Sequence, residues 1–151
     1  MLCPAVQHRR HGTTTVEFAI ACPIAFFFIF ATIVGGLGVF RYQQVASAAR
    51  EGARYACVRG AQYAQETGRP AATPDDVYTN AIVPAASALD PSQLTYSVTW
   101  DQSNVPLQVI SNVETPRGNT VTVTVNYQWF PEMYLIGPYN LTSTSTAQMV
   151  Y

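Results

Sequence analysis

The sequence predicts an α+β protein: a long N-terminal transmembrane helix that continues into a neck helix, followed by a short helix and a small antiparallel sheet. Three observations lead to this fold. Residues 18–40 carry no charge and would form a helix about 35 Å long, against a hydrocarbon core of about 30 Å. Residues 41–59 lack proline and are rich in alanine, so the helix is expected to continue. Residues 94–100 and 121–129 alternate apolar with polar side chains, which is typical of a half-buried strand.

The apolar run is too long for the core of an ordinary signal peptide, which has about 7–15 residues. Residues 46–48 (Ala-Ser-Ala) resemble a signal-peptidase site, but Arg41 and polar residues separate them from the run. These observations favour a membrane anchor over a cleaved secretory signal. Arg9 and Arg10 precede the run and indicate a cytoplasmic N-terminus. We therefore expect a single-pass protein held in a lipid bilayer, with its C-terminal domain on the far side.

The composition argues against catalysis. All eight basic residues are arginines, and both histidines, His8 and His11, lie within the first twelve residues. Because the rest of the chain has neither histidine nor lysine, it lacks the usual general base and amine nucleophile, and we expect no enzyme and no catalytic residues. A net charge of −1 argues against a nucleic-acid partner. Cys3, Cys22 and Cys57 have no metal-ligand spacing and no pairing within reach, so neither a metal nor another cofactor is expected.

A single carboxylate, Glu17, stands at the edge of the apolar run. It needs a reason, because the bilayer centre disfavours a carboxylate by about 2.5–3.5 kcal/mol. One interpretation is a capping box, since Thr14 and Glu17 have the T-x-x-E spacing of a helix start. The other interpretation uses Gly12. Cleavage after Gly12 would make Thr13 a new N-terminus with an α-amine pKa of about 8, and Glu17 could pair with that amine on a neighbouring subunit.

These residues resemble a known family. Residues 9–12 (Arg-Arg-His-Gly), the Glu17-Phe18 pair and the following apolar helix look like a prepilin-peptidase substrate. Together with Pro23 and residues 48–54 (Ala-Ala-Arg-Glu-Gly-Ala-Arg), they resemble the TadE-like pseudopilins of the tight-adherence (Flp) pilus system. The leader departs from the family's pattern because it is short and contains histidine without lysine.

The resemblance implies a pilin-like fold and a role in assembling a Flp/Tad-type pilus or a related secretion apparatus. It also implies cleavage between Gly12 and Thr13 by a prepilin peptidase, and lateral contacts with other pilin or pseudopilin subunits through Glu17 and Phe18. The protein would then reside in the bacterial inner (cytoplasmic) membrane or enter a pilus. Two alternatives belong to other classes: a membrane-tethered binding module that is not processed, and a secreted enzyme cut near Ala48.

Small residues mark places where a neighbour can approach the membrane helix. Pro23 is expected to kink the helix or to loosen one of its hydrogen bonds. Gly35, Gly36 and Gly38 leave little side-chain bulk near the outer end. These residues are either simply common in membrane helices or a packing site for neighbouring helices.

The neck helix is expected to have two different faces. Small and apolar residues recur at four, three and four positions on one face, which would pack against the chain's own sheet or against another subunit: Val45, Ala49, Gly52 and Ala56. The opposite side carries Arg50 and Arg54 one turn apart, with Glu51 within reach of Arg54. These charges are either a solvated face or a contact for carboxylates of an adjoining subunit.

The segments define four regions: a leader at 1–12, the transmembrane (about 16–40) and neck helix at 13–60, a polar linker at 61–73, and an extracytoplasmic domain at 74–151. Thr73 and Pro74 predict the start of a helix that reaches about Leu89 unless Pro84 ends it. Residues 90 and 91 (Asp-Pro) predict a turn after it.

Four strands are expected to form an antiparallel sheet, with a turn at 115–119: residues 94–100, 107–113, 121–129 and 141–151. Four aromatic residues surround the loop before the last strand: Trp129, Phe130, Tyr134 and Tyr139. We expect them to cover the sheet, with an exposed partner-binding tip as the alternative.

Overall fold

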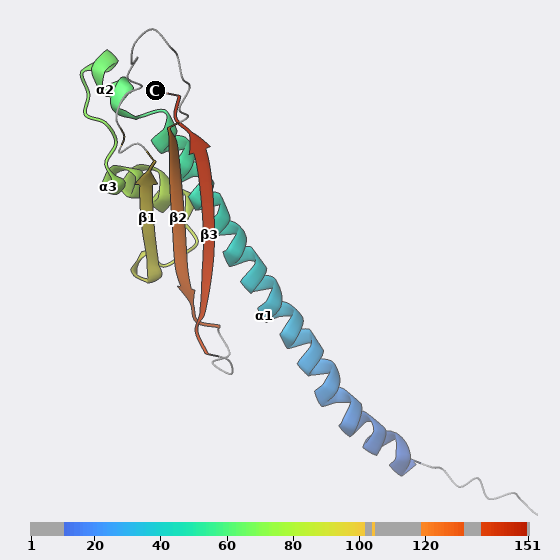
Figure 1. Cartoon of the computed structure of the whole chain (residues 1–151). Coiled ribbons are helices and arrows are strands. Elements are labelled where there is room, and N and C mark those ends of the chain that lie inside the picture. Colours follow the sequence, from blue (N-terminus) through green and yellow to red (C-terminus); the bar gives the residue numbers. More distant parts are fainter. Residues whose placement is uncertain (1–10, 102–103, 105–118, 132–136, 151) are drawn as a thin grey trace, which may run out of the picture. The chain divides into compact units, whose positions relative to one another are not determined.

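The computed structural model describes residues 11–101, 104, 119–131 and 137–150, with side chains from residue 14 onward (Figure 1). The elements are α1 (His11–Cys57), α2 (Ala61–Thr67), α3 (Pro74–Val77), η1 (Tyr78–Ile82), α4 (Val83–Ala85), η2 (Pro91–Gln93), β1 (Leu94–Trp100), β2 (Thr120–Trp129) and β3 (Tyr139–Gln148). This confirms the predicted α+β fold. The chain divides into two compact units, with the boundary between Leu37 and Gly38.

The first unit contains the apolar part of α1. Among the described residues, one helix is long and apolar enough to cross a membrane, and none of its most apolar window is buried within the chain. The helix assignment is continuous through Pro23. The membrane and neck segments therefore belong to a single helix, as expected from the lack of any breaker between Phe40 and Arg59.

The second unit is built around the neck part of α1. The small face predicted from periodicity is buried, which confirms that prediction: Val45, Ala49, Gly52 and Ala56. A Cβ built on Gly52 would lie 3.1 Å from Cγ1 of both Ile82 and Val123. The chain's own sheet and its own short helical segment therefore pack against this face. They can approach it closely because Gly52 has no side chain.

Three strands form an antiparallel sheet in the order β1-β2-β3. In this sheet Trp100 pairs with Val121, and Trp129 pairs with Tyr139. Alternate residues of β2 face the neck and are buried, from Val121 to Trp129. The strands at 94–100 and 121–129 are confirmed, whereas the last strand begins two residues earlier than expected and ends at Gln148. The predicted strand at 107–113 and the turn residues 115–118 lie outside the described residues.

β2 runs along the neck in the opposite direction to α1. Val123 contacts Gly52, and Trp129 contacts Gly38. The fourteen residue steps from Gly38 to Gly52 span about 21 Å along the helix, and the six steps from Val123 to Trp129 span about 20 Å along the strand. The two elements therefore cover nearly the same length, and the end of β2 returns to the start of the second unit (Figure 1).

The helical segment at 74–85 starts as predicted. The amide of Asp76 donates to the Thr73 hydroxyl at 3.2 Å, and the amide of Thr73 donates back to the Asp76 carboxylate at 3.0 Å. Pro74 occupies the first turn, where no amide hydrogen is needed. The segment passes through the π-helical turn η1 before Pro84 and ends at Ala85, earlier than the expected Leu89, because proline cannot continue the hydrogen-bond ladder.

Aromatic contacts attach this segment to the sheet. The rings of Tyr78 and Tyr96 stack with centroids 4.4 Å apart, and the Tyr96 hydroxyl donates to Asp75 at 2.6 Å. That hydrogen bond to a carboxylate raises the pKa of Tyr96. The stacked pair joins η1 to β1 at the rim of the core.

The polar segment expected to be a linker contains a two-turn helix, α2. Its alanine, glutamine and glutamate residues favour a helix, so the prediction of a linker without helix is wrong here. α2 ends at Gly68, which adopts φ 68° and donates its amide to Ala64. Glycine suits this left-handed cap because it has no Cβ.

The capping box predicts a pH dependence. The Thr73 hydroxyl and amide donate to Asp76 and hold the pKa of its carboxyl below the usual value. The unfolded chain has the usual pKa of about 3.9, so the cap stabilises the folded state above that pH and the contribution is lost as pH falls through the lower folded pKa. In Thr73→Ala we expect the Asp76 pKa to return toward the usual value, as measured by NMR titration. Thr79→Ala is the control, and an unchanged pKa in Thr73→Ala would contradict the assignment.

Candidate functional site

The region around the predicted cleavage site lies at the start of α1. The helix begins at His11, so the backbone of Gly12 and Thr13 is helical. This placement overturns the capping-box interpretation of Glu17. A capping residue must lie outside the helix, whereas Thr14 is inside it, and no acidic residue lies in the first turn. No proline lies between His11 and Thr14, so nothing in this stretch stops the helix from including the residues before Thr14.

Glu17 and Phe18 are both exposed, and Phe18 is 70% accessible. Neighbouring large apolar side chains of this helix are exposed as well, including Val16, Ile20 and Phe27. Burying one such side chain stabilises a protein by about 1.5–3 kcal/mol. So much exposed apolar surface requires lipid or neighbouring helices to cover it. Glu17 is the acidic group on this surface that stands closest to the helix start among the described residues.

The glycines predicted to pack helices fall into two groups. A Cβ on Gly35 or Gly36 would have no atom within 4 Å, so these two positions face open space in the chain. A Cβ on Gly38 would lie 2.7 Å from Cζ3 of Trp129. Gly38, like Gly52, is therefore used by the chain's own sheet, and Gly35 and Gly36 are left for contacts outside the chain.

This division gives a prediction for Gly38→Ala. The new methyl group would overlap a rigid ring, so Trp129 must shift, and such overpacking typically costs about 1–3 kcal/mol. We expect a lower unfolding midpoint and a changed Trp129 fluorescence spectrum in detergent. Gly36→Ala adds the same methyl group in open space and should leave both unchanged. Equal effects of the two substitutions would show that Gly38 has no special contact.

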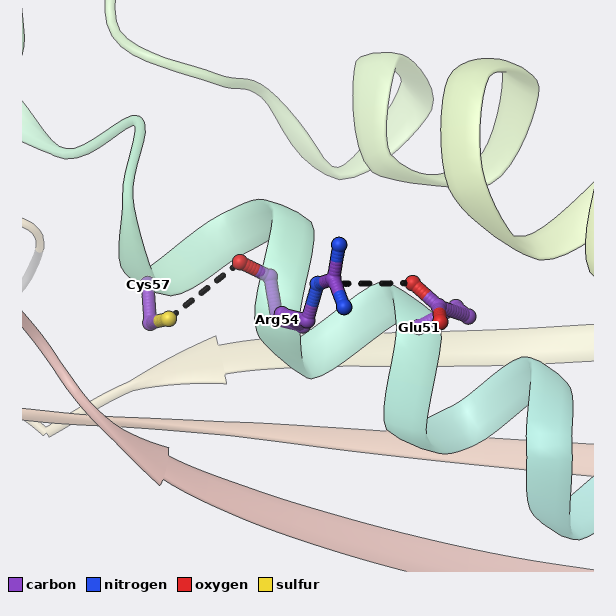
Figure 2. A network of polar contacts seen from close by, with 3 residues as sticks. All are labelled: Glu51, Arg54 and Cys57. Atoms are coloured by element: carbon purple, nitrogen blue, oxygen red, sulfur yellow. Dashed lines mark hydrogen bonds and ion pairs between the residues drawn. The ribbon is translucent and has the colours of Figure 1, made fainter.

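Near the end of α1, polar contacts join Arg54 to Glu51 and to Cys57 (Figure 2). Arg54 Nε lies 3.7 Å from Glu51 Oε2, and these side chains are 79% and 51% exposed. Exposed pairs of this kind contribute only about 0–1 kcal/mol, so the pair does not explain the fold. Arg50 donates to the carbonyl of Ala46, one turn back in its own helix. The predicted reach of Glu51 to Arg54 is confirmed, and all three charges remain accessible.

Cys57 lies next to Arg54 on the buried side of α1. Its thiol donates to the carbonyl of Arg54 at 3.2 Å, and burial raises its pKa. Cys22 and Cys57 are free thiols. Within the described part of the chain, no three His, Cys, Asp or Glu side chains gather to hold a metal ion.

A groove that the sequence did not reveal lies beside these charges. We call it the neck groove; it has a volume of about 550 Å³ and is lined by Glu51, Arg54, Tyr55, Val58, Arg59, Asn80, Ala81, Pro84 and Ala85. The Arg59 guanidinium lies 4.0 Å from the centre of the Tyr55 ring, a cation–π contact. The i,i+4 spacing of Tyr55 and Arg59 was the available sequence signal, but the part played by residues 80–85 depends on tertiary packing.

The aromatic residues near the β2–β3 connection divide between core and surface. Trp129 is only 7% exposed and covers the sheet as predicted, whereas Phe130 and Tyr139 are each 46% exposed. The rings of Trp129 and Tyr139 are 6.4 Å apart. Tyr134 lies outside the described residues. We call Trp129, Phe130 and Tyr139 the aromatic end of the sheet.

Comparison with known proteins finds one family. Residues 12–54 match the family model described as TadE-like protein, which spans less than a third of the chain. The match begins at the predicted cleavage glycine and ends at Arg54 in the neck. No curated protein and no solved structure matches the chain.

Proposed function

The chain carries a TadE-like segment at residues 12–54, and from this premise we propose that it is a minor pseudopilin-like subunit in the assembly of a Flp/Tad-type pilus or a related secretion apparatus. It is a non-enzymatic protein of the bacterial inner (cytoplasmic) membrane that acts through α1. Its N-terminus is cytoplasmic, and its second unit is extracytoplasmic. Its partners are a prepilin peptidase, other pilin or pseudopilin subunits and the lipid bilayer.

One observation carries this proposal. The family match covers most of α1. The most apolar window of this helix has a mean hydropathy of 2.4, and none of its residues is buried within the chain. In contrast, the neck face that follows is fully covered by the chain's own elements. The exposed surface of α1 is therefore the surface that lipid and neighbouring subunits would share.

The proposed mechanism has two steps. A prepilin peptidase removes the leader after Gly12, and Thr13 becomes the N-terminus. Its α-amine, with a pKa of about 8, is cationic at neutral pH. The carboxylate of Glu17 on a neighbouring subunit then pairs with this amine at the membrane edge, where opposite charges 4 Å apart attract by about 4 kcal/mol at an effective dielectric constant of 20.

Helix replacement tests this proposal. Residues 14–37 are exchanged for an unrelated single-pass anchor of the same length, and the second unit is kept from Gly38 onward. We expect the chimaera to reach the membrane and to fold, but to leave a deletion strain without surface pili, counted by electron microscopy. The wild-type chain restores pili in the same strain. Pili restored by the chimaera would contradict a role for the helix in packing.

The runner-up is a membrane-tethered binding module that keeps its leader. The neck groove favours it, because a recess with aromatic, arginine and amide side chains can hold a partner's polar segment. This function predicts that the chimaera restores pili fully and that substitutions in the groove abolish them. The helix-replacement experiment therefore separates the two functions.

A further inference from the structure

We infer that the aromatic end of the sheet, Trp129, Phe130 and Tyr139, is seated in the lipid–water interface where α1 leaves the bilayer. The inference rests on the part of the proposed function in which α1 crosses the membrane. It requires neither leader cleavage nor pilus assembly. The occupant of this surface is lipid rather than a protein partner.

The first argument is the position of Gly38 along the apolar run. The run at 18–40 is about 35 Å long and exceeds the hydrocarbon core by about 5 Å, or roughly three residues. Gly38 is the third residue from the end of the run, and the charged Arg41 follows it. Gly38 therefore lies at the boundary between acyl chains and headgroups, whether the excess falls at one end of the helix or is shared.

The second argument is contact between this boundary and the sheet. The ring of Trp129 fills the space beside Gly38, where a Cβ would be 2.7 Å from it. Arg41 Nη1 lies 3.3 Å from the Tyr127 hydroxyl, one step further from the membrane along both elements. The last residues of β2 thus occupy the same depth as the last turn of the apolar run. A tilt of about 20° would shift this depth by only a few ångströms, because the ring touches the helix.

The third argument is the kind of side chain found there. Phe130 and Tyr139 are 46% exposed and flank the buried Trp129, and Phe40 and Tyr42 on α1 are half exposed at the same level. Tryptophan and tyrosine concentrate at membrane interfaces, because an apolar ring can enter the acyl boundary while its polar group stays among headgroups. Arginine suits the adjacent headgroup layer for the same reason. In water these exposed rings would have no comparable role.

The protein contains a built-in pair of probes, because its two tryptophans lie at opposite ends of the sheet. Trp100 pairs with Val121, eight residues along β2 from Trp129, a separation of about 26 Å. Trp100→Phe leaves Trp129 as the sole fluorophore, and Trp129→Phe leaves Trp100. Each full-length variant is reconstituted in phosphatidylcholine–phosphatidylglycerol vesicles whose acyl chains carry bromine either near the headgroup or near the methyl end.

The inference predicts strong quenching of Trp129 by bromine near the headgroup, weak quenching by bromine near the methyl end, and little quenching of Trp100 by either. Phe130→Asp should reduce the headgroup-level quenching of Trp129 several-fold, whereas Phe130→Leu should preserve it. Val150→Asp is the matched control, since Val150 is exposed and lies at the other end of the neck, where its amide donates a hydrogen bond to the carbonyl of Cys57. The unfolding midpoint of each variant reports whether it still folds.

Trp129 quenched no more than Trp100 in carbonate-resistant, membrane-inserted protein would overturn the inference and leave the proposed function standing. Protein that carbonate extracts from the vesicles would overturn both. If the Phe130→Asp variant folds and its Trp129 keeps full quenching, the sheet end is near the bilayer only because α1 anchors it. This result too would overturn the inference that the exposed rings lie in the lipid–water interface.

Discussion

Glu17→Ala is expected to leave the leader cleaved but to abolish co-isolation of the chain with other pilus subunits. Removal of the carboxylate leaves the α-amine of Thr13 on the neighbouring subunit without its counter-charge at the membrane edge. The proposed cleavage would act on the peptide bond after Gly12 and would not need this pairing. Affinity isolation from detergent-extracted membranes, followed by mass spectrometry of the recovered subunits, measures the outcome.

Thr14→Ala provides the control for this experiment. A capping box would need Thr14 as much as Glu17, so the two substitutions would then behave alike. Because Thr14 lies inside α1, we expect Thr14→Ala to assemble normally. Unaltered co-isolation of Glu17→Ala with its partners would refute the pairing role.

The second large effect is expected for Gly52→Val, which should destabilise the second unit. A Cβ at this position is already 3.1 Å from Cγ1 of Ile82 and of Val123, and valine adds two more methyl groups. Overpacking of this kind typically costs about 1–3 kcal/mol, a large part of a domain stability of about 5–15 kcal/mol. Denaturant unfolding in detergent, followed by circular dichroism, gives the change in the free energy of unfolding.

A double-mutant cycle makes this prediction specific. Gly52→Ala inserts one methyl group, and Val123→Ala removes one of the two closest atoms. Together they should cost less than the sum of the single substitutions, because the new methyl group occupies part of the space that Val123 vacates. Gly36→Val, which meets open space, should not change the free energy of unfolding of this unit. Strict additivity of the cycle would contradict the packing at Gly52.

Periodicity predicted the neck face and the central strand, because each pattern is local. Val45, Ala49, Gly52 and Ala56 share a face by helix geometry alone, and the alternation in β2 follows from strand geometry. The sequence could not decide what covers the neck face. That depends on contacts such as Gly38 with Trp129, which are 91 positions apart along the chain.

The two candidate capping boxes show where a local motif is ambiguous. Thr73 and Thr14 each precede an acidic residue by three positions, but only Thr73 caps a helix. Thr73 is followed by Pro74, which cannot continue a helix backwards because its ring removes the amide hydrogen. Thr14 is followed by Thr15 rather than by proline, and α1 includes the residues before it as far as His11.

The remaining differences depend on tertiary structure as well. α2 forms within a segment that looked like a linker, since its helix formers were outweighed by Gly68 and Pro70 nearby. The neck groove combines one face of α1 with residues 80–85, and no local pattern places these together. The division of the aromatic end into buried Trp129 and exposed Phe130 and Tyr139 follows from strand pleating and from the position of Gly38.

The mass of the N-terminal peptide, measured on protein extracted from the native membrane, tests the central claim most directly. A processed pseudopilin-like subunit gives a mature chain that begins at Thr13. A chain that still begins at Met1 would contradict processing and favour the tethered binding module. A chain that begins near Ala49 would contradict the membrane anchor itself.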